Sequence, residues 1–172
     1  MTSITATPAL ACVGPHNYTE ERIVSYLQRM LCSDYAATDA CRCKTCRLII
    51  ERRSPQVTWI EPSSDYLLED LAPLFAIAQY RLAPDEHHFF ILTQAERLST
   101  TCGNRLLKTL EEPPTGYRFI FLTQNYEALL PTIQSRCTTL FRAPEEISAV
   151  HALLSYFTDP DRRNDPVGFD NF

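Results

Sequence analysis

Glycine is scarce in this chain, and the marks of several protein classes are missing. Only 4 of its 172 residues are glycine, against 12 prolines, which predicts stiff loops. Its apolar runs fall far short of the roughly 20 residues that a transmembrane helix needs. Residues 1–10 lack the basic and apolar regions of a secretory signal. We therefore expect a cytoplasmic protein that does not associate with membranes.

Basic residues are also fewer than acidic ones, with 16 Lys and Arg against 21 Asp and Glu. The formal net charge of -5 argues against a surface that grips nucleic acid by itself. The hydrophobic fraction of 45% and the charged fraction of 22% are ordinary for a globular protein. A chain of this length can hold one domain with a real core and the start of a second.

Apolar runs and amphipathic stretches alternate along the chain. The runs predict strands and the amphipathic stretches predict helices. The expected strands are 9–13, 57–62, 88–92, 117–123 and 138–141. The first expected helix has Thr19 as its N-cap. The other expected helical segments are 65–82, 99–112, short helical material at 127–137, and 144–157. This order is typical of an α/β fold, with a parallel five-stranded sheet and helices on both faces.

The first strand and its helix stand where a nucleotide-binding α/β protein carries a phosphate loop. That motif reads G-x-x-x-x-G-K-[ST], whereas the sequence from Gly14 reads GPHNYTEE. Thr19 thus stands at the second glycine, Glu20 at the lysine and Glu21 at the hydroxyl ligand. In a first helical turn these carboxylates would take the positive helix end and repel a triphosphate. The alternative is a helix with an acidic start that was never a phosphate loop.

The chain has 7 cysteines, a high number for a reducing compartment. The cluster comprises Cys32, Cys41, Cys43 and Cys46, and the scattered ones are Cys12, Cys102 and Cys137. A tight cluster indicates a metal site, and a Cys-x-x-Cys pair supplies two thiolates with a spacing that suits zinc. Reduced cysteines in a surface loop are the alternative.

Two specific motifs lie in residues 104–137. They are LLKTLEEPP at 106–114 and the tripeptide SRC at 135–137. On these motifs the chain, from about residue 9 to 143, resembles the gamma/tau and delta-prime family of bacterial DNA polymerase III clamp-loader subunits. The resemblance implies a P-loop fold of the AAA+ type over residues 1–143. It further implies a zinc-binding loop insertion at about 32–46.

The resemblance also places a second nucleotide element. The segment ILTQAERLS occupies the position of a Walker B segment, with Thr93 and Gln94 where acidic residues hold magnesium. Both nucleotide elements are then degraded together. Gamma and tau hydrolyse ATP, whereas delta-prime typically does not, so the chain looks like the delta-prime type, and we expect no bound ATP.

The zinc module of the family is commonly spaced C-x8-C-x2-C-x2-C. Cys32 and Cys41 match its first gap, but the gap between Cys41 and Cys43 is one residue short, so Cys41 is the least secure ligand. Five basic residues are expected to offset the charge of a four-thiolate zinc site: Arg42, Lys44, Arg47, Arg52 and Arg53.

Arg136 in the SRC tripeptide matches an arginine finger, which reaches across a subunit boundary to a neighbour's ATP. A guanidinium suits this role because it is always charged and planar. A surface arginine in a local ion pair is the alternative. Thr123 matches the sensor-1 region, with a structural role. The acids Glu111 and Glu112 oppose the dipole at a helix C-terminus, which indicates either a partner or a solvated helix end.

The resemblance implies a non-catalytic subunit that supports sliding-clamp loading in DNA replication. Its expected partners are the gamma/tau and delta subunits and, indirectly, the sliding clamp and primer-template DNA. A stand-alone zinc adaptor is one alternative. An active gamma/tau-type ATPase is another, opposed by the residues at both nucleotide elements. Residues 144–172 are expected to hold the start of a helical lid and a disordered tail. No collar domain is expected, so the chain is either a reduced or truncated subunit, or one that assembles through its first domain alone.

Overall fold

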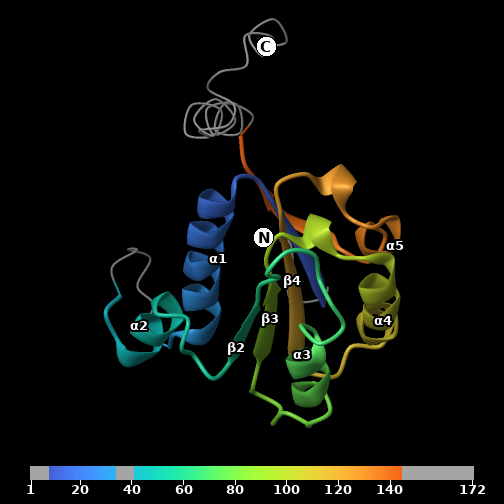
Figure 1. The fold of residues 1–172 in the computed structure, drawn as a ribbon. Coiled ribbons are helices and arrows are strands. Elements are labelled where there is room, and N and C mark those ends of the chain that lie inside the picture. Colours follow the sequence, from blue (N-terminus) through green and yellow to red (C-terminus); the bar gives the residue numbers. More distant parts are fainter. Residues whose placement is uncertain (1–7, 34–40, 145–172) are drawn as a thin grey trace, which may run out of the picture.

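The sheet of this protein is parallel throughout. The structure is a computed structural model, which describes residues 8–33 and 41–144. Five strands lie in the order β2-β3-β4-β1-β5 (Figure 1). They are β1 (Ala9–Val13), β2 (Val57–Ile60), β3 (His88–Leu92), β4 (Tyr117–Thr123) and β5 (Thr138–Arg142). The predicted α/β class with a parallel five-stranded sheet is confirmed.

Helices cover both faces of this sheet (Figure 1). One face packs against α1 (His16–Leu31) and α2 (Lys44–Ile50). The other packs against α3 (Ala72–Ile77), α4 (Thr100–Glu111) and α5 (Pro131–Gln134). Two short 3₁₀ turns complete the described elements, η2 (Ala95–Arg97) and η3 (Tyr126–Ala128).

Side-chain alternation along the strands divides the interior into two hydrophobic cores. Leu10 and Cys12 of β1 face the core under α1, whereas Ala9 and Ala11 face the core under α4. Every residue of β1 and β3 is buried, which is why these strands read as continuous apolar runs. Each large side chain buried in this way contributes about 1.5–3 kcal/mol.

Helix α1 begins earlier than the sequence predicts. Its N-cap is Pro15, and Thr19 lies inside the helix, where it is buried and its hydroxyl donates to the carbonyl of His16 at 2.9 Å. The fixed φ of proline suits a helix start, and a threonine hydroxyl that bonds back to the preceding turn needs no cap position. The expectation that Glu20 and Glu21 lie in the first turn is therefore wrong.

The chain reverses between β1 and α1 in a turn of two residues. Gly14 has φ of 148°, and a Cβ built on it would lie 2.5 Å from the Cβ of Ala143. Its N–H donates to the carbonyl of Thr123 at 2.9 Å, which ties the turn to the end of β4. Only glycine fits this close approach.

Two helical segments differ from the prediction. Helix α2 stands where a loop was expected, because the Sγ of Cys43 accepts the N–H of Cys46 at 3.3 Å and caps a new helix. Only Ala72–Ile77 of the expected helix 65–82 is α-helical. Pro73 falls at the start of α3, and a proline ring does not allow the helix to extend through it from the N-terminal side.

The rest of the prediction agrees with the structure within a few residues. Helix α4 has the expected cap, because the hydroxyl of Ser99 accepts the N–H of Cys102 at 3.3 Å. The expected helix 144–157 and the tail after it lie outside the described residues. Within residues 8–33 and 41–144, no helix has the length and apolar character needed to cross a bilayer.

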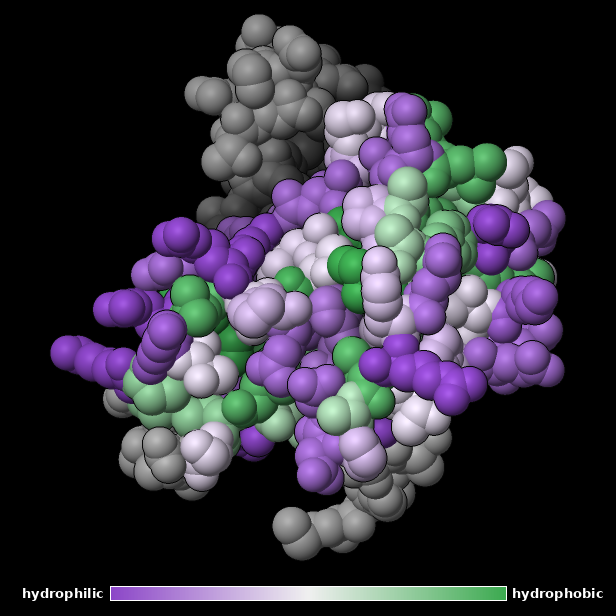
Figure 2. Space-filling model, turned by 90° about the horizontal axis from the view of Figure 1, so that it is seen from below, coloured by the Kyte–Doolittle hydropathy of each residue, from purple (hydrophilic) through white to green (hydrophobic). Residues whose placement is uncertain are grey.

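Large exposed hydrophobic residues are few among those described: Ile50, Leu67, Leu68 and Tyr80. On the face seen from below, hydrophobic side chains form separate small patches between hydrophilic ones (Figure 2). That face therefore presents no broad apolar surface.

Candidate functional site

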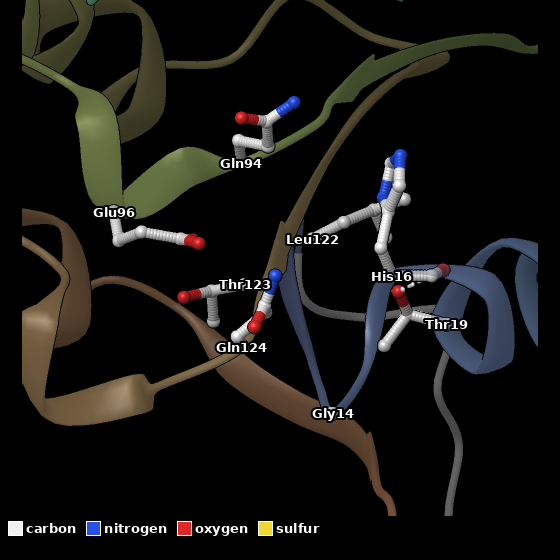
Figure 3. Close-up of a pocket in the computed structure, with 8 residues that line it drawn as sticks. All are labelled: Gly14, His16, Thr19, Gln94, Glu96, Leu122, Thr123 and Gln124. Atoms are coloured by element: carbon white, nitrogen blue, oxygen red, sulfur yellow. Dashed lines mark hydrogen bonds between the residues drawn. The ribbon is translucent and has the colours of Figure 1, made fainter. Parts of the chain in front are cut away.

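The two segments matched to nucleotide elements meet at the carboxyl edge of the sheet, where α/β proteins bind their ligands. A cavity lies there between the first turn of α1 and the ends of β3 and β4 (Figure 3). Its lining residues are Gly14, His16, Thr19, Gln94, Glu96, Leu122, Thr123 and Gln124. Its volume of about 10 Å³ is room for roughly one water molecule.

Glu20, which replaces the motif's lysine, takes part in an internal ion pair. Its Oε1 lies 2.6 Å from an Nη2 of Arg52 and 3.4 Å from Nε2 of His16. The Glu20 side chain is only 19% exposed. The carboxylate is therefore held by two basic groups of its own chain, while Glu21 beside it is exposed.

Arg52 links this pair to the sheet edge. Its guanidinium also binds the carboxylate of Glu61 and lies 4.3 Å above the ring of Trp59. Its backbone has φ of 54°, a left-handed conformation that is uncommon outside glycine. This turn directs the side chain back across β2 to α1, so the end of α2 and the start of α1 are joined through one guanidinium.

The segment that resembles a Walker B element makes structural contacts. Thr93 is fully buried, and its carbonyl accepts the hydroxyl of Tyr66 at 2.6 Å. Gln94 has φ of 48°, and the chain turns there into η2. Gln94 lines the cavity, and Glu96 extends from η2 toward the end of β4 (Figure 3).

Thr123, which the resemblance matched to the sensor-1 region, is the last residue of β4. It is buried, and its hydroxyl donates to the carbonyl of Asn125 at 2.9 Å. The same oxygen accepts the Asn125 N–H at 3.2 Å. These bonds hold the turn that follows the strand.

The four clustered cysteines converge although they come from separate segments. Cys32 is the C-cap of α1, Cys43 is the N-cap of α2, and Cys46 lies in the first turn of α2. The four Sγ atoms all lie within 4.8 Å of one another. The Sγ of Cys32 is 3.7 Å from that of Cys41 and 3.6 Å from that of Cys43. The shortened spacing thus does not exclude Cys41 from the cluster.

This geometry fits a tetrahedral zinc ion. Zinc bound to four thiolates at about 2.3 Å keeps its sulfurs roughly 3.8 Å apart. The N–H of Cys46 lowers the pKa of Cys43 to about 7, which favours the thiolate that a metal needs. Burial raises the pKa of Cys46, so this thiol would need the metal's own charge to ionise.

The basic residues near the cluster are not all directed at it. Arg47 and Arg53 lie 3.9 and 3.8 Å from the carboxylate of Glu51. Arg52 binds Glu20 and Glu61. Three of the five basic residues that were expected to offset thiolate charge thus form ion pairs with carboxylates, and their effect on the cluster stays a prediction.

Arg136 follows α5 at an edge of the molecule, and its side chain is 31% exposed. Its Nη1 donates to the carbonyl of Thr132 at 3.0 Å and to the hydroxyl of Ser135 at 3.1 Å, and its Nη2 binds Glu111. Its own N–H donates to the carbonyl of Ile133 at 3.0 Å. Both the backbone and the guanidinium are thus held in place.

Comparison with known proteins decides the family. A profile described as "DNA polymerase III, delta subunit" matches residues 5–145. The chain belongs to the DNA polymerase III clamp-loader subunit family. Subunit tau of Salmonella typhimurium is 35% identical over 125 residues, 73% of this chain and 20% of that protein. Subunit delta' of Pseudomonas aeruginosa is 29% identical over 113 residues, 63% of this chain and 34% of that protein.

The structural comparison agrees on the fold. A DNA polymerase III gamma subunit-related protein of Thermotoga maritima matches with a TM-score of 0.57 and 21% identity, over 81% of this chain and 43% of that one. The fold is thus of the AAA+ type. This clamp-loader family member spans a fifth to a third of the length of the curated relatives named above.

Sequence reasoning missed three structural features of this clamp-loader family member: Glu96 at the cavity and the ion pairs of Arg52 and Arg136. The segment that contained Glu96 was recognised, but only Thr93 and Gln94 were singled out in it. Arg52 was expected only beside the cysteine cluster, because its ion pair with Glu20 depends on a left-handed turn. The partner expected for Glu111 is Arg136 of the same chain.

Proposed function

We propose that this chain is a non-catalytic, delta-prime-like subunit of the DNA polymerase III clamp loader. The observation that carries the proposal is the ion pair of Glu20 at the position of the phosphate-loop lysine. A carboxylate stands where the motif has lysine, and Arg52 and His16 of the same chain hold it. The cavity beside it admits roughly one water, far less than a triphosphate needs.

The identities alone would favour a different member of the family. The tau relative is 35% identical and the delta' relative 29%. An ATPase of the gamma/tau type needs backbone N–H groups in a glycine-rich loop and a lysine on the phosphates. Here α1 begins at His16, inside the span of that loop, and Glu20 replaces the lysine. These residues favour the inert subunit over the active ATPase.

We propose that Arg136 acts in trans as an arginine finger. It lies at an edge of the domain, part of its side chain is exposed, and contacts within the chain hold its guanidinium. A group in fixed position can meet developing phosphate charge without reorganisation. The neighbour would be a gamma/tau subunit, with delta, the sliding clamp and primer-template DNA elsewhere in the assembly.

We also propose that Cys32, Cys41, Cys43 and Cys46 bind one structural zinc ion. The distances among their Sγ atoms support a closed four-sulfur site. Residues 1–143 would form the degenerate AAA+ domain, with the lid beginning in 144–172.

The finger is tested with Arg136→Ala in a reconstituted clamp loader. The substitution should leave folding and zinc content intact and slow ATP turnover, because fingers in other nucleotide hydrolases are worth about 10³–10⁵ in rate and one site among several would be affected. Arg136→Lys should restore little, since an ammonium cannot copy the planar fork. Arg105→Ala, at another exposed arginine, is the control. Turnover unchanged by Arg136→Ala would refute the assignment.

A stand-alone zinc adaptor is the second candidate, favoured by the well-formed cysteine cluster. Pull-down from cell extract separates the two. A loader subunit should co-purify with gamma/tau and delta, and an adaptor should not.

A further inference from the structure

The guanidinium of Arg136 is held from one side only. Nη1 gives its two hydrogens to the carbonyl of Thr132 and the hydroxyl of Ser135, and Nη2 gives one to Glu111. A guanidinium has five N–H donors. Among the contacts of the described residues, these occupy three, and the remaining donors stay available for a ligand at the exposed part of the side chain.

Glu111 is the last residue of α4, where a carboxylate is unfavourable. The negative end of the helix dipole opposes it, as it opposes Glu112. The ion pair with Arg136, 25 residues later in the chain, compensates for this placement. Glu111 therefore joins the end of α4 to the segment after α5, the part of the chain from which Arg136 projects.

We infer that Glu111 is a positioning residue for Arg136, an inference that rests on the proposed arginine finger. A long arginine side chain loses much rotamer freedom when it is fixed on a phosphate. With Glu111, Thr132 and Ser135 as partners, most of that freedom is lost on folding, before the neighbour's ATP arrives. The finger is then presented in one orientation, which raises the rate of the chemical step.

A release mechanism makes the opposite prediction. If Glu111 restrained Arg136 and had to let go, its removal would speed turnover. The geometry favours positioning, because Glu111 takes only one hydrogen of Nη2 and leaves the other edge of the guanidinium unoccupied among the described residues.

The test uses Glu111→Ala, Glu111→Gln and Glu112→Ala in a reconstituted loader. Glu111→Ala should lower the kcat of ATP turnover about threefold to fivefold, as befits a partly exposed ion pair, with little change in the KM for ATP. Glu111→Gln should keep most of the activity, because an amide oxygen still accepts the Nη2 hydrogen. Glu112→Ala, the neighbouring exposed acid, should leave kcat unchanged.

A double variant separates positioning from a general loss of structure. In the Arg136→Ala background, Glu111→Ala should cause no further loss of turnover. An additive loss, a faster enzyme, or equal effects of Glu111→Ala and Glu112→Ala would overturn the inference while leaving the finger intact. If Arg136→Ala itself has no effect, both the finger and the inference fail.

Discussion

At the scale of single residues, Glu20 carries most of the proposal that this chain is not a nucleotide hydrolase. Its position in the motif belongs to a lysine, and Arg52 supplies the positive charge from a distant part of the chain. An ion pair within the chain thus lies at the position that the motif gives to a lysine and its phosphates. An ion pair of this kind contributes modestly to stability, because Arg52 is partly exposed.

Reversing the charge of Glu20 should destabilise the fold without creating a nucleotide site. Glu20→Lys would replace the partner of Arg52 with a second cation, and urea denaturation should show a loss of about 1 kcal/mol in unfolding free energy. Glu21, the exposed neighbour, provides the control, since Glu21→Lys should change the unfolding free energy by less than about 0.5 kcal/mol. ATP should not bind to Glu20→Lys, because α1 still begins within the span of the loop. Micromolar ATP binding by this variant would contradict the account.

At the scale of elements, the cysteine cluster joins two helices. Cys32 ends α1, and Cys43 and Cys46 begin α2, whose Ile49 is buried in the core under α1. Helix α2 has only 7 residues, too few to be stable alone. A metal at its N-terminus would anchor it, and Arg52 follows closely after its last residue.

Loss of one cysteine should release the metal and loosen α2. Wild-type protein purified without chelator should contain one zinc per chain by elemental analysis, and Cys46→Ser should contain little. Hydrogen exchange should quicken in α2 while the sheet remains protected, because the sheet is held by its own two cores. Cys137→Ser, outside the cluster, should keep its zinc. A wild-type zinc content near zero would rule the site out.

Strands were predicted better than helix starts, for a physical reason. Strands β1, β3 and β4 lie at the predicted residues, because burial on both faces makes most of each strand apolar. The start of α1 was misplaced, because proline and threonine can each begin a helix and only packing decides between them. Helix α2 was missed, because its cap is a cysteine thiol, which also fits a metal-binding loop.

The sequence pointed to most residues of the candidate sites, but it predicted only some of the contacts that these residues make. The short spacing around Cys41 left its place in the cluster in doubt, and the fold brings its Sγ to the others. The partners of Glu20 and Arg136 come from segments far away in the chain, so local patterns carry no trace of them. Such ion pairs depend on which helices and strands pack side by side in the fold, and local sequence patterns do not specify that.

At the scale of the whole molecule, three sites are arranged around one parallel sheet. The small cavity lies at the carboxyl edge, the cysteine cluster lies where α1 ends and α2 begins, and Arg136 follows α5 on the other face. The sheet and its two cores provide a firm frame for all three. The protein thus has the frame of an AAA+ domain, and we propose that its role in catalysis is exerted at its edge, on a neighbour.

The central claim is that this domain binds no ATP of its own, and titration calorimetry tests it most directly. The full chain should be titrated with magnesium ATP up to millimolar concentration, with zinc content verified in the same sample. We predict heats of dilution only, because Glu20 replaces the lysine and the cavity holds roughly one water. Saturable binding with a micromolar Kd would contradict the account and favour an active ATPase of the gamma/tau type.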